Sequence, residues 1–137
     1  MRRLVATAAL VATALLAATA LGAGGITPIS PKRGDTVPAG QRATFKMRYS
    51  GKGPIYVHVC KSPRKDGDGL ICHRESIGKA RKVTSSRAVY RAKFFDFPEF
   101  WLNQPGTYYW QAHRIACENG NIDDCRIEGP VVRFKVG

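Results

Sequence analysis

The stretch GTYYWQAHRIAC, residues 106–117, carries the clearest β-strand pattern of the sequence. It is rich in aromatic residues, which favour strands. Tyr108, Trp110 and Ala112 occupy alternate positions, so a strand would place all three on one face. We therefore predict that Trp110 anchors a hydrophobic core.

Shorter strand patterns fill the rest of the chain after residue 25. Gly, Pro, Asn and Asp interrupt it at short intervals, and no helical period appears between them. In IYVHVC, residues 55–60, Ile and Val alternate with Tyr, His and Cys, as in a strand, and in RATFKMRYS, residues 42–50, the alternation predicts one buried and one solvent-facing side. Such short strands with frequent turns predict an all-β fold, a single two-sheet antiparallel β-sandwich. The predicted strands are residues 26–31, 42–50, 55–60, 70–78, 79–83, 88–97, 106–117 and 129–136.

The N-terminus has the layout of a secretory signal peptide. Two arginines are followed by an uncharged run of Ala, Leu and Val and then by small residues. Cleavage after Ala20 or Gly22 fits the small residues at those places, and we predict that residues 1–22 are the signal. The apolar run is also about long enough to span a bilayer, so an uncleaved anchor stays an alternative. We expect a secreted, extracellular product with one domain at residues 25–137.

Both ends of this domain resemble a known family. PGTYYWQA, residues 105–112, followed by EGPVVRFKV, residues 128–136, resembles the last two strands of fibronectin type III-like domains in exported bacterial proteins, which have an immunoglobulin-like β-sandwich fold. The segment at residues 26–51 resembles their first two strands. The position of Tyr108 resembles a tyrosine corner, which implies a ring in the core and a hydroxyl bonded to the backbone. The four cysteines depart from the usual pattern of the family.

Four cysteines in an oxidising compartment predict two disulfides, for which three pairings exist. We predict Cys60 with Cys72 and Cys117 with Cys125, because each pair closes a connection between strands expected to be adjacent. The main rival pairs Cys60 with Cys117. A zinc site built from these cysteines and His73 lacks the closely spaced ligand pairs of structural zinc sites.

Catalysis has little support in the sequence, and we predict that the protein is not an enzyme. There is no G-x-S-x-G or H-E-x-x-H motif, and oxidised cysteines are not nucleophiles. His58, His73 and His113 read as scattered, and the carboxylates show no acid and base pair. DGDG at 66–69 and ENGNIDD at 118–124 contain calcium-type oxygen ligands but also typical turn residues. We therefore predict neither a metal nor a cofactor.

Two further sequence features are candidate binding sites, and each also has an ordinary structural explanation. Arg33-Gly34-Asp35 is a tripeptide that integrins recognise, but Gly and Asp also favour a turn. Tyr109 with Tyr56 or Trp101 would form an aromatic platform for sugars, whereas core packing is the more ordinary role of such residues.

The charge distribution is the strongest functional signal. The chain has a net charge of +12, and residues 32–93 hold 16 basic and 4 acidic residues, against 4 and 6 in residues 94–137. We predict a basic face that binds an anionic polymer, such as a phosphate-bearing or acidic glycan of the cell envelope, through contacts that salt screens. The residues predicted to form it are Lys61, Arg64, Lys65, Lys79, Arg81, Lys82, Arg87, Arg91 and Lys93.

The function predicted from these observations is that of a secreted, non-catalytic binding or adhesion-type module. Its partner is an anionic envelope polymer or another extracellular protein, and the oligomeric state stays open. We expect no nucleic-acid partner, because the chain is exported and its aromatic residues do not interleave with its charges. No membrane contact is expected after signal cleavage. The alternative is a structural extracellular module without a specific ligand, whose charge serves solubility.

Overall fold

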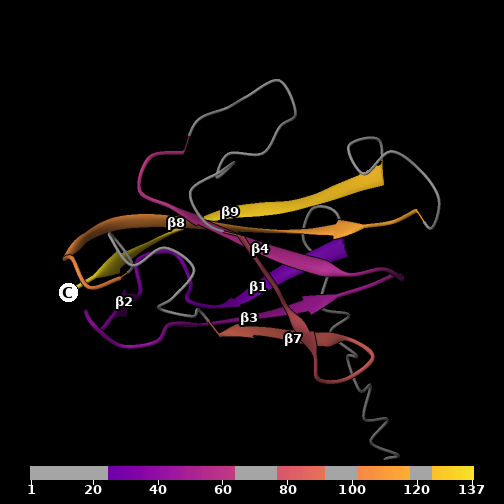
Figure 1. Cartoon of the computed structure of the whole chain (residues 1–137), viewed down its shortest axis with the longest axis horizontal. Coiled ribbons are helices and arrows are strands. Elements are labelled where there is room, and N and C mark those ends of the chain that lie inside the picture. The colour runs from indigo at the N-terminus through magenta and orange to yellow at the C-terminus, as the bar shows by residue number, and fades with distance from the viewer. Residues whose placement is uncertain (1–24, 64–76, 92–101, 118–124) are drawn as a thin grey trace, which may run out of the picture.

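The computed structural model describes residues 25–63, 77–91, 102–117 and 125–137, and the elements of these residues are all β-strands (Figure 1). The all-β prediction is confirmed. The predicted signal peptide lies outside the described residues. In the described part of the chain, no helix is both long and apolar enough to cross a membrane.

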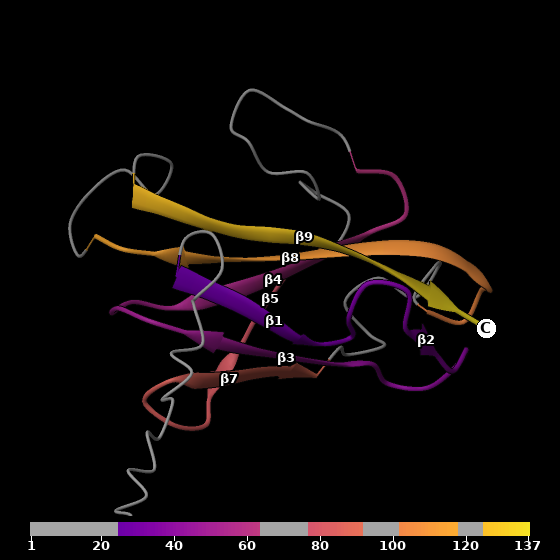
Figure 2. The ribbon, with the colours of Figure 1, turned by 180° about the vertical axis from the view of Figure 1, so that it is seen from behind.

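The strands form two sheets. The first contains β1 (Ile26–Ser30), β3 (Thr44–Tyr49), β7 (Arg87–Arg91) and β6 (Arg81–Lys82) in that order, and every neighbouring pair is antiparallel. The second contains β2 (Thr36–Val37), β9 (Arg126–Val136), β8 (Gly106–Ile115), β4 (Ile55–Cys60) and β5 (Ile77–Lys79). Figure 2 shows β8 and β9 side by side on one side of the molecule and β3 and β7 on the other.

The prediction of purely antiparallel sheets is wrong at β2, which pairs in parallel with β9. Hydrogen bonds from the preceding turn explain this arrangement. The amide of Gly34 donates to the carbonyl of Arg133, and the amide of Lys135 donates to the carbonyl of Asp35. The turn is therefore docked on β9 before β2 begins, which places β2 along the same strand.

The hydrophobic core lies between the two sheets. Phe45 of β3 packs against Trp110 of β8, with ring centroids 5.3 Å apart, and against Phe134 of β9 at 5.8 Å. Trp110 is fully buried, and its indole N–H donates to the carbonyl of Pro31 over 3.0 Å. Trp110 is therefore the core anchor that the sequence predicted.

Tyr108 begins the same buried row of β8. Its side chain is 3% exposed, and its hydroxyl donates to the backbone carbonyl of Gln104 over 2.9 Å. The predicted combination of a buried ring and a hydroxyl bonded to the backbone is confirmed.

The chain passes from one sheet to the other at Ala80. β5 is an edge strand of the second sheet, β6 is an edge strand of the first, and Ala80 between them is buried. Both edge strands are short and carry Lys79, Arg81 and Lys82. Lysine and arginine at such edges discourage pairing with the edge of another molecule.

Candidate functional site

Cations line the outward side of the first sheet. Phe45, Met47 and Tyr49 of β3 are buried, so the residues between them point away from the core. The same alternation holds in β7, where Ala88 and Tyr90 are buried. We call this side the basic face, and its cationic residues are Lys46, Arg48, Arg81, Arg87 and Arg91.

Strand pairing brings these cations close together. Arg48 lies directly opposite Arg87, while Val89 lies opposite both Lys46 on one side and Arg81 on the other. Directly opposite residues have Cβ atoms about 5 Å apart. Four of the five cations are exposed, and Arg48 is half-buried. The face therefore concentrates positive charge on a rigid part of the fold.

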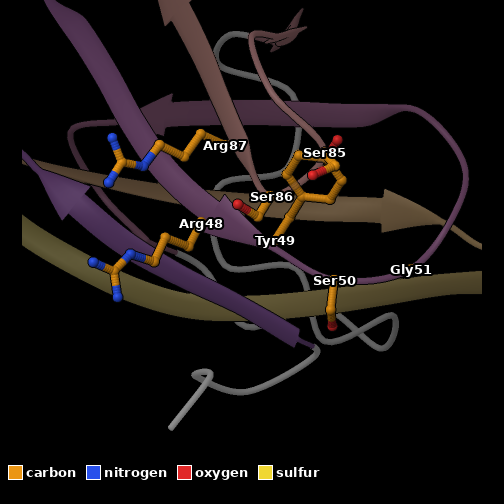
Figure 3. A pocket seen from close by; sticks show the side chains of 7 residues that line it. All are labelled: Arg48, Tyr49, Ser50, Gly51, Ser85, Ser86 and Arg87. Carbon is orange, nitrogen blue, oxygen red and sulfur yellow. The ribbon is translucent and has the colours of Figure 1, made fainter. Parts of the chain in front are cut away.

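The arginine pair stands beside a hollow of about 660 Å³, which is lined by residues 48–51 and 85–87. In Figure 3 the side chains of Arg48 and Arg87 extend in the same direction from neighbouring strands. The hydroxyl of Tyr49 donates to the carbonyl of Thr84 over 2.9 Å, and its amide donates to the carbonyl of Ser86. These bonds hold the turn before β7 against the end of β3.

In the described part of the chain, the Asp and Glu side chains lie outside the strands of the first sheet. The four strands of the first sheet contain no Asp or Glu. Among the described residues the carboxylates are Asp35, which accepts from the amide of Lys32 over 2.7 Å, and Glu128, which lies 3.4 Å from the Nε of Arg126. Both belong to segments of the second sheet or the turn docked on it. The charged side chains of the four strands of the first sheet are therefore all cationic.

Three of the nine predicted patch residues, Arg81, Arg87 and Arg91, lie on the basic face. Lys46 and Arg48 were missed as members of it. The alternation of apolar and polar residues in 42–50 puts both on the solvent side of their strand, but only the pairing of β3 with β7 places them beside Arg87 and Arg91.

The other described patch residues lie near the face or away from it. Lys79 and Lys82 are exposed and share with Arg81 a second hollow of about 450 Å³. The ammonium of Lys82 lies 5.0 Å from the ring centroid of Tyr49. Lys61 directly follows β4, and its ammonium donates to the Oε1 of Gln104 over 2.6 Å. The remaining three, which lie outside the described residues, are Arg64, Lys65 and Lys93.

The histidines of β4 and β8 are not scattered, which corrects the sequence interpretation. The Nε2 of His58 lies 2.9 Å from the Nδ1 of His113, and both side chains are 4% exposed. Burial, His58 and Arg126 lower the pKa of His113 to about 3. His113 is therefore neutral near pH 7, and its low pKa makes it a poor general base there. His73 lies outside the described residues.

The side of β4 that carries Tyr56, His58 and Cys60 is partly buried. Besides His58, Cys60 is 2% exposed, and Gln111 on the neighbouring strand is 3% exposed. The amide of Gln111 donates to the carbonyl of Gly129 over 3.0 Å, and Cys60 is disulfide-bonded. These polar groups can be buried because each has a partner, which alternation alone does not reveal.

The cysteine prediction is confirmed for Cys117 and Cys125. They form a disulfide with Cα atoms 5.4 Å apart, which links the end of β8 to the start of β9. The adjacent amide of Ala116 donates to the carbonyl of Cys125 over 2.8 Å. The predicted partner of Cys60, which is Cys72, lies outside the described residues.

The described aromatic residues do not form the alternative sugar platform. Tyr56 pairs with His113 and stacks on its ring, whereas Tyr109 pairs with Cys60, four residues away along β4. Trp101 lies outside the described residues. Arg33-Gly34-Asp35 is an exposed turn, as predicted, with Gly34 at φ 87°.

Metal-binding clusters are absent from the described residues, in which no three His, Cys, Asp or Glu side chains gather. Both calcium-like segments, residues 66–69 and 118–124, lie entirely outside this part of the chain. No protein-family model, curated protein or solved structure matches the sequence. The resemblance to fibronectin type III-like domains thus stays a prediction.

Proposed function

We propose that the chain is a secreted, non-catalytic binding module of immunoglobulin-like or fibronectin type III-like β-sandwich fold, and that its basic face binds an anionic polymer of the cell envelope. The observation that carries the binding proposal is the register of β3 and β7. It sets Arg48 directly opposite Arg87 and extends the line of cations with Lys46 and Arg91. Like charges directly opposite are unfavourable, so the pair of Arg48 and Arg87 favours the approach of an anionic ligand.

The order of the strands supports the sandwich part of the proposal. The sheet order β1-β3-β7-β6 corresponds to strands A, B, E and D of an immunoglobulin-like domain, and β9-β8-β4 corresponds to G, F and C. The bond from the hydroxyl of Tyr108 to the carbonyl of Gln104 corresponds to a tyrosine corner at the start of strand F.

Electrostatics define how such a face works. Each exposed contact between a cation and an anion contributes little alone, but a polymer makes several at once. Salt screens these contacts, so the affinity falls as ionic strength rises. Nucleic acid fits less well, because the outward positions of β3 and β7 carry no aromatic residue on which bases would stack.

The proposal is tested by removing charge from the basic face alone. The first variant replaces Arg48, Arg87 and Arg91 with Gln. A control variant makes the same replacement at Lys32, Arg133 and Lys135, which are exposed on or beside β9. Both variants lose three charges, so only the location differs.

Binding to a soluble anionic polymer is measured at about 50 mM and about 200 mM salt. We expect the first variant to bind at least about tenfold more weakly than the wild type at low salt and to depend less on salt, because about three ion contacts are gone. The control should change the affinity by less than about threefold. Equal losses in the two variants would show that net charge alone binds the polymer. An absence of salt-dependent binding in the wild type would favour the structural module instead.

A further inference from the structure

A second group of cations lies where the chain passes from β5 to β6. Lys79, Arg81 and Lys82 are exposed and, together with residues 53–55, line the hollow of about 450 Å³. We call it the seam hollow, because β5 is an edge strand of the second sheet and β6 is an edge strand of the first. None of its described lining residues is acidic. Three cations thus line one concave part of the surface.

Packing fixes the backbone around the seam hollow. Ala80 is buried, and its amide donates to the carbonyl of Ile55 over 2.8 Å. A Cβ atom on Gly78 would collide with the ring of Tyr90, so the glycine allows β5 to lie directly on this core residue. A ligand therefore enters the hollow without having to order its backbone first, which lowers the free-energy cost of binding.

The side chain of Lys82 is held at this edge. Lys82 lies opposite the buried Ala88, so it leaves β6 on the core side of the sheet. Its ammonium lies 5.0 Å from the ring centroid of Tyr49, whose hydroxyl donates to the carbonyl of Thr84. A cation–π contact restricts the ammonium without using all of its N–H donors, so Lys82 can still donate to an anion.

Arg81 connects the seam hollow with the basic face. It lies opposite Val89, which stands between the buried Ala88 and Tyr90, so Arg81 extends on the outward side of the sheet. Lys46 lies opposite the same valine from β3, which puts the backbones of Lys46 and Arg81 two strand spacings, about 10 Å, apart. A chain that crosses the strands from Lys46 therefore meets Arg81 next and then the seam hollow.

We propose that the seam hollow is a second site for anionic groups of the polymer, which crosses from the basic face over the edge at β6. This inference rests on the polyanion binding proposed above and adds Lys79 and Lys82 to the residues that hold the polymer. A cleft lined by charges of one sign concentrates the electrostatic field. An anionic group is therefore held more tightly in the hollow than on the open face of a strand.

The residue types of the hollow define which anions it accepts. Two of its three cations are lysines, whose ammonium is a compact point charge with rotatable donors and lacks the planar fork of a guanidinium. The hollow therefore binds carboxylate and phosphodiester groups alike. Its ligand is a flexible anionic chain long enough to contact the basic face and the hollow at the same time.

The test compares poly(glycerol phosphate) with a fragment that carries two phosphate groups, which is too short to contact Lys46 and the seam hollow at once. The seam variant replaces Lys79 and Lys82 with Gln. A control variant makes the same replacement at Lys32 and Lys135, which are exposed on or beside β9. Both variants lose two charges, so only the location differs.

Binding is measured at one low ionic strength. We expect the seam variant to bind poly(glycerol phosphate) about fivefold more weakly than the wild type, because two ion contacts are gone. The control should change the affinity by less than about twofold. The gain in affinity from the fragment to the polymer should shrink in the seam variant and stay unchanged in the control. Polygalacturonate, a carboxylate polymer, should show the same loss in the seam variant.

A charge-preserving variant and a single replacement complete the test. Replacing Lys79 and Lys82 with Arg keeps both charges and should leave the affinity within about twofold of the wild type. Lys79→Gln alone changes an exposed side chain and should weaken binding by about twofold, which keeps the test valid if the double variant does not fold.

Each outcome separates the two proposals. Equal losses in the seam variant and the control, or an unchanged affinity in the seam variant, would overturn the seam site while leaving polyanion binding intact. A loss with the phosphate polymer alone would overturn the acceptance of both anions. A wild type that binds neither polymer would overturn both proposals.

Discussion

Acidification should destabilise the fold through the buried histidine pair. His113 is 4% exposed, lies 2.9 Å from His58 through its Nδ1 and has a pKa of about 3 in the folded protein, against 6.5 ordinarily. Around it lie Tyr56, which stacks on its ring, Arg126, which lowers its pKa, and Glu128, which pairs with it on β9. The low pKa means that protonating His113 costs more free energy in the folded protein than in the unfolded chain.

The sign and size of the effect follow from proton binding. Below about pH 6.5 the unfolded chain binds a proton at His113, whereas the folded chain does not until about pH 3. Titration of His113 therefore leaves the free energy of unfolding unchanged above pH 6.5 and lowers it as the pH falls below that value. Through His113 alone, the free energy of unfolding should fall by about 2 kcal/mol between pH 7.5 and pH 5, and by about 4 kcal/mol by pH 3. For a domain of this size, 2 kcal/mol lowers Tm by roughly 8 °C.

Urea unfolding followed by tryptophan fluorescence at several pH values between about 7.5 and 5 measures this effect, and carboxylates titrate mostly below that range. His113→Gln keeps a polar side chain but removes the titration, so it should lose most of the pH dependence whatever its absolute stability. Lys135→Gln, an exposed control on β9, should keep it. The reasoning is refuted if the wild type is equally stable at both ends of the range, or if His113→Gln retains the full dependence.

Three further changes test the fold and the face. Tyr108→Phe removes the bond to a backbone carbonyl and should lower the free energy of unfolding by about 1 kcal/mol in urea, because the acceptor loses its donor; an unchanged midpoint would contradict the tyrosine corner. Replacing Cys117 and Cys125 with Ser opens a short loop and should cost about 2.5 kcal/mol, measured by thermal unfolding against the oxidised wild type. Arg87→Gln relieves the like-charge pair with Arg48 and should stabilise the unliganded protein by a few tenths of a kcal/mol at low salt, an increase that high salt should abolish.

Local patterns predicted the parts of the fold that alternation controls. Tyr108, Trp110 and Ala112 are buried on one side of β8, as their spacing indicated. The disulfide between Cys117 and Cys125 was also predictable, because the two cysteines close a short connection between neighbouring strands. Each of these features depends on residues close together in the sequence.

The features that the sequence did not reveal depend on pairing between strands that are far apart in the sequence. Arg48 and Arg87 meet only because β3 pairs with β7 in one register, and no local pattern specifies that partner. His58 and His113 are likewise 55 residues apart. A polar residue on an alternating strand is expected to face solvent, but a partner on the next strand allows it to be buried.

The location of polymer binding tests the central claim most directly. Two-dimensional NMR of the ¹⁵N-labelled protein, titrated with poly(glycerol phosphate) at low salt, reports which backbone amides sense the ligand. The account predicts that the shifts concentrate on β3, β6 and β7, with the largest at Arg48 and Arg87, and that the amides of β9 stay in place. Shifts concentrated on the second sheet, or none at polymer concentrations that saturate binding, would contradict it.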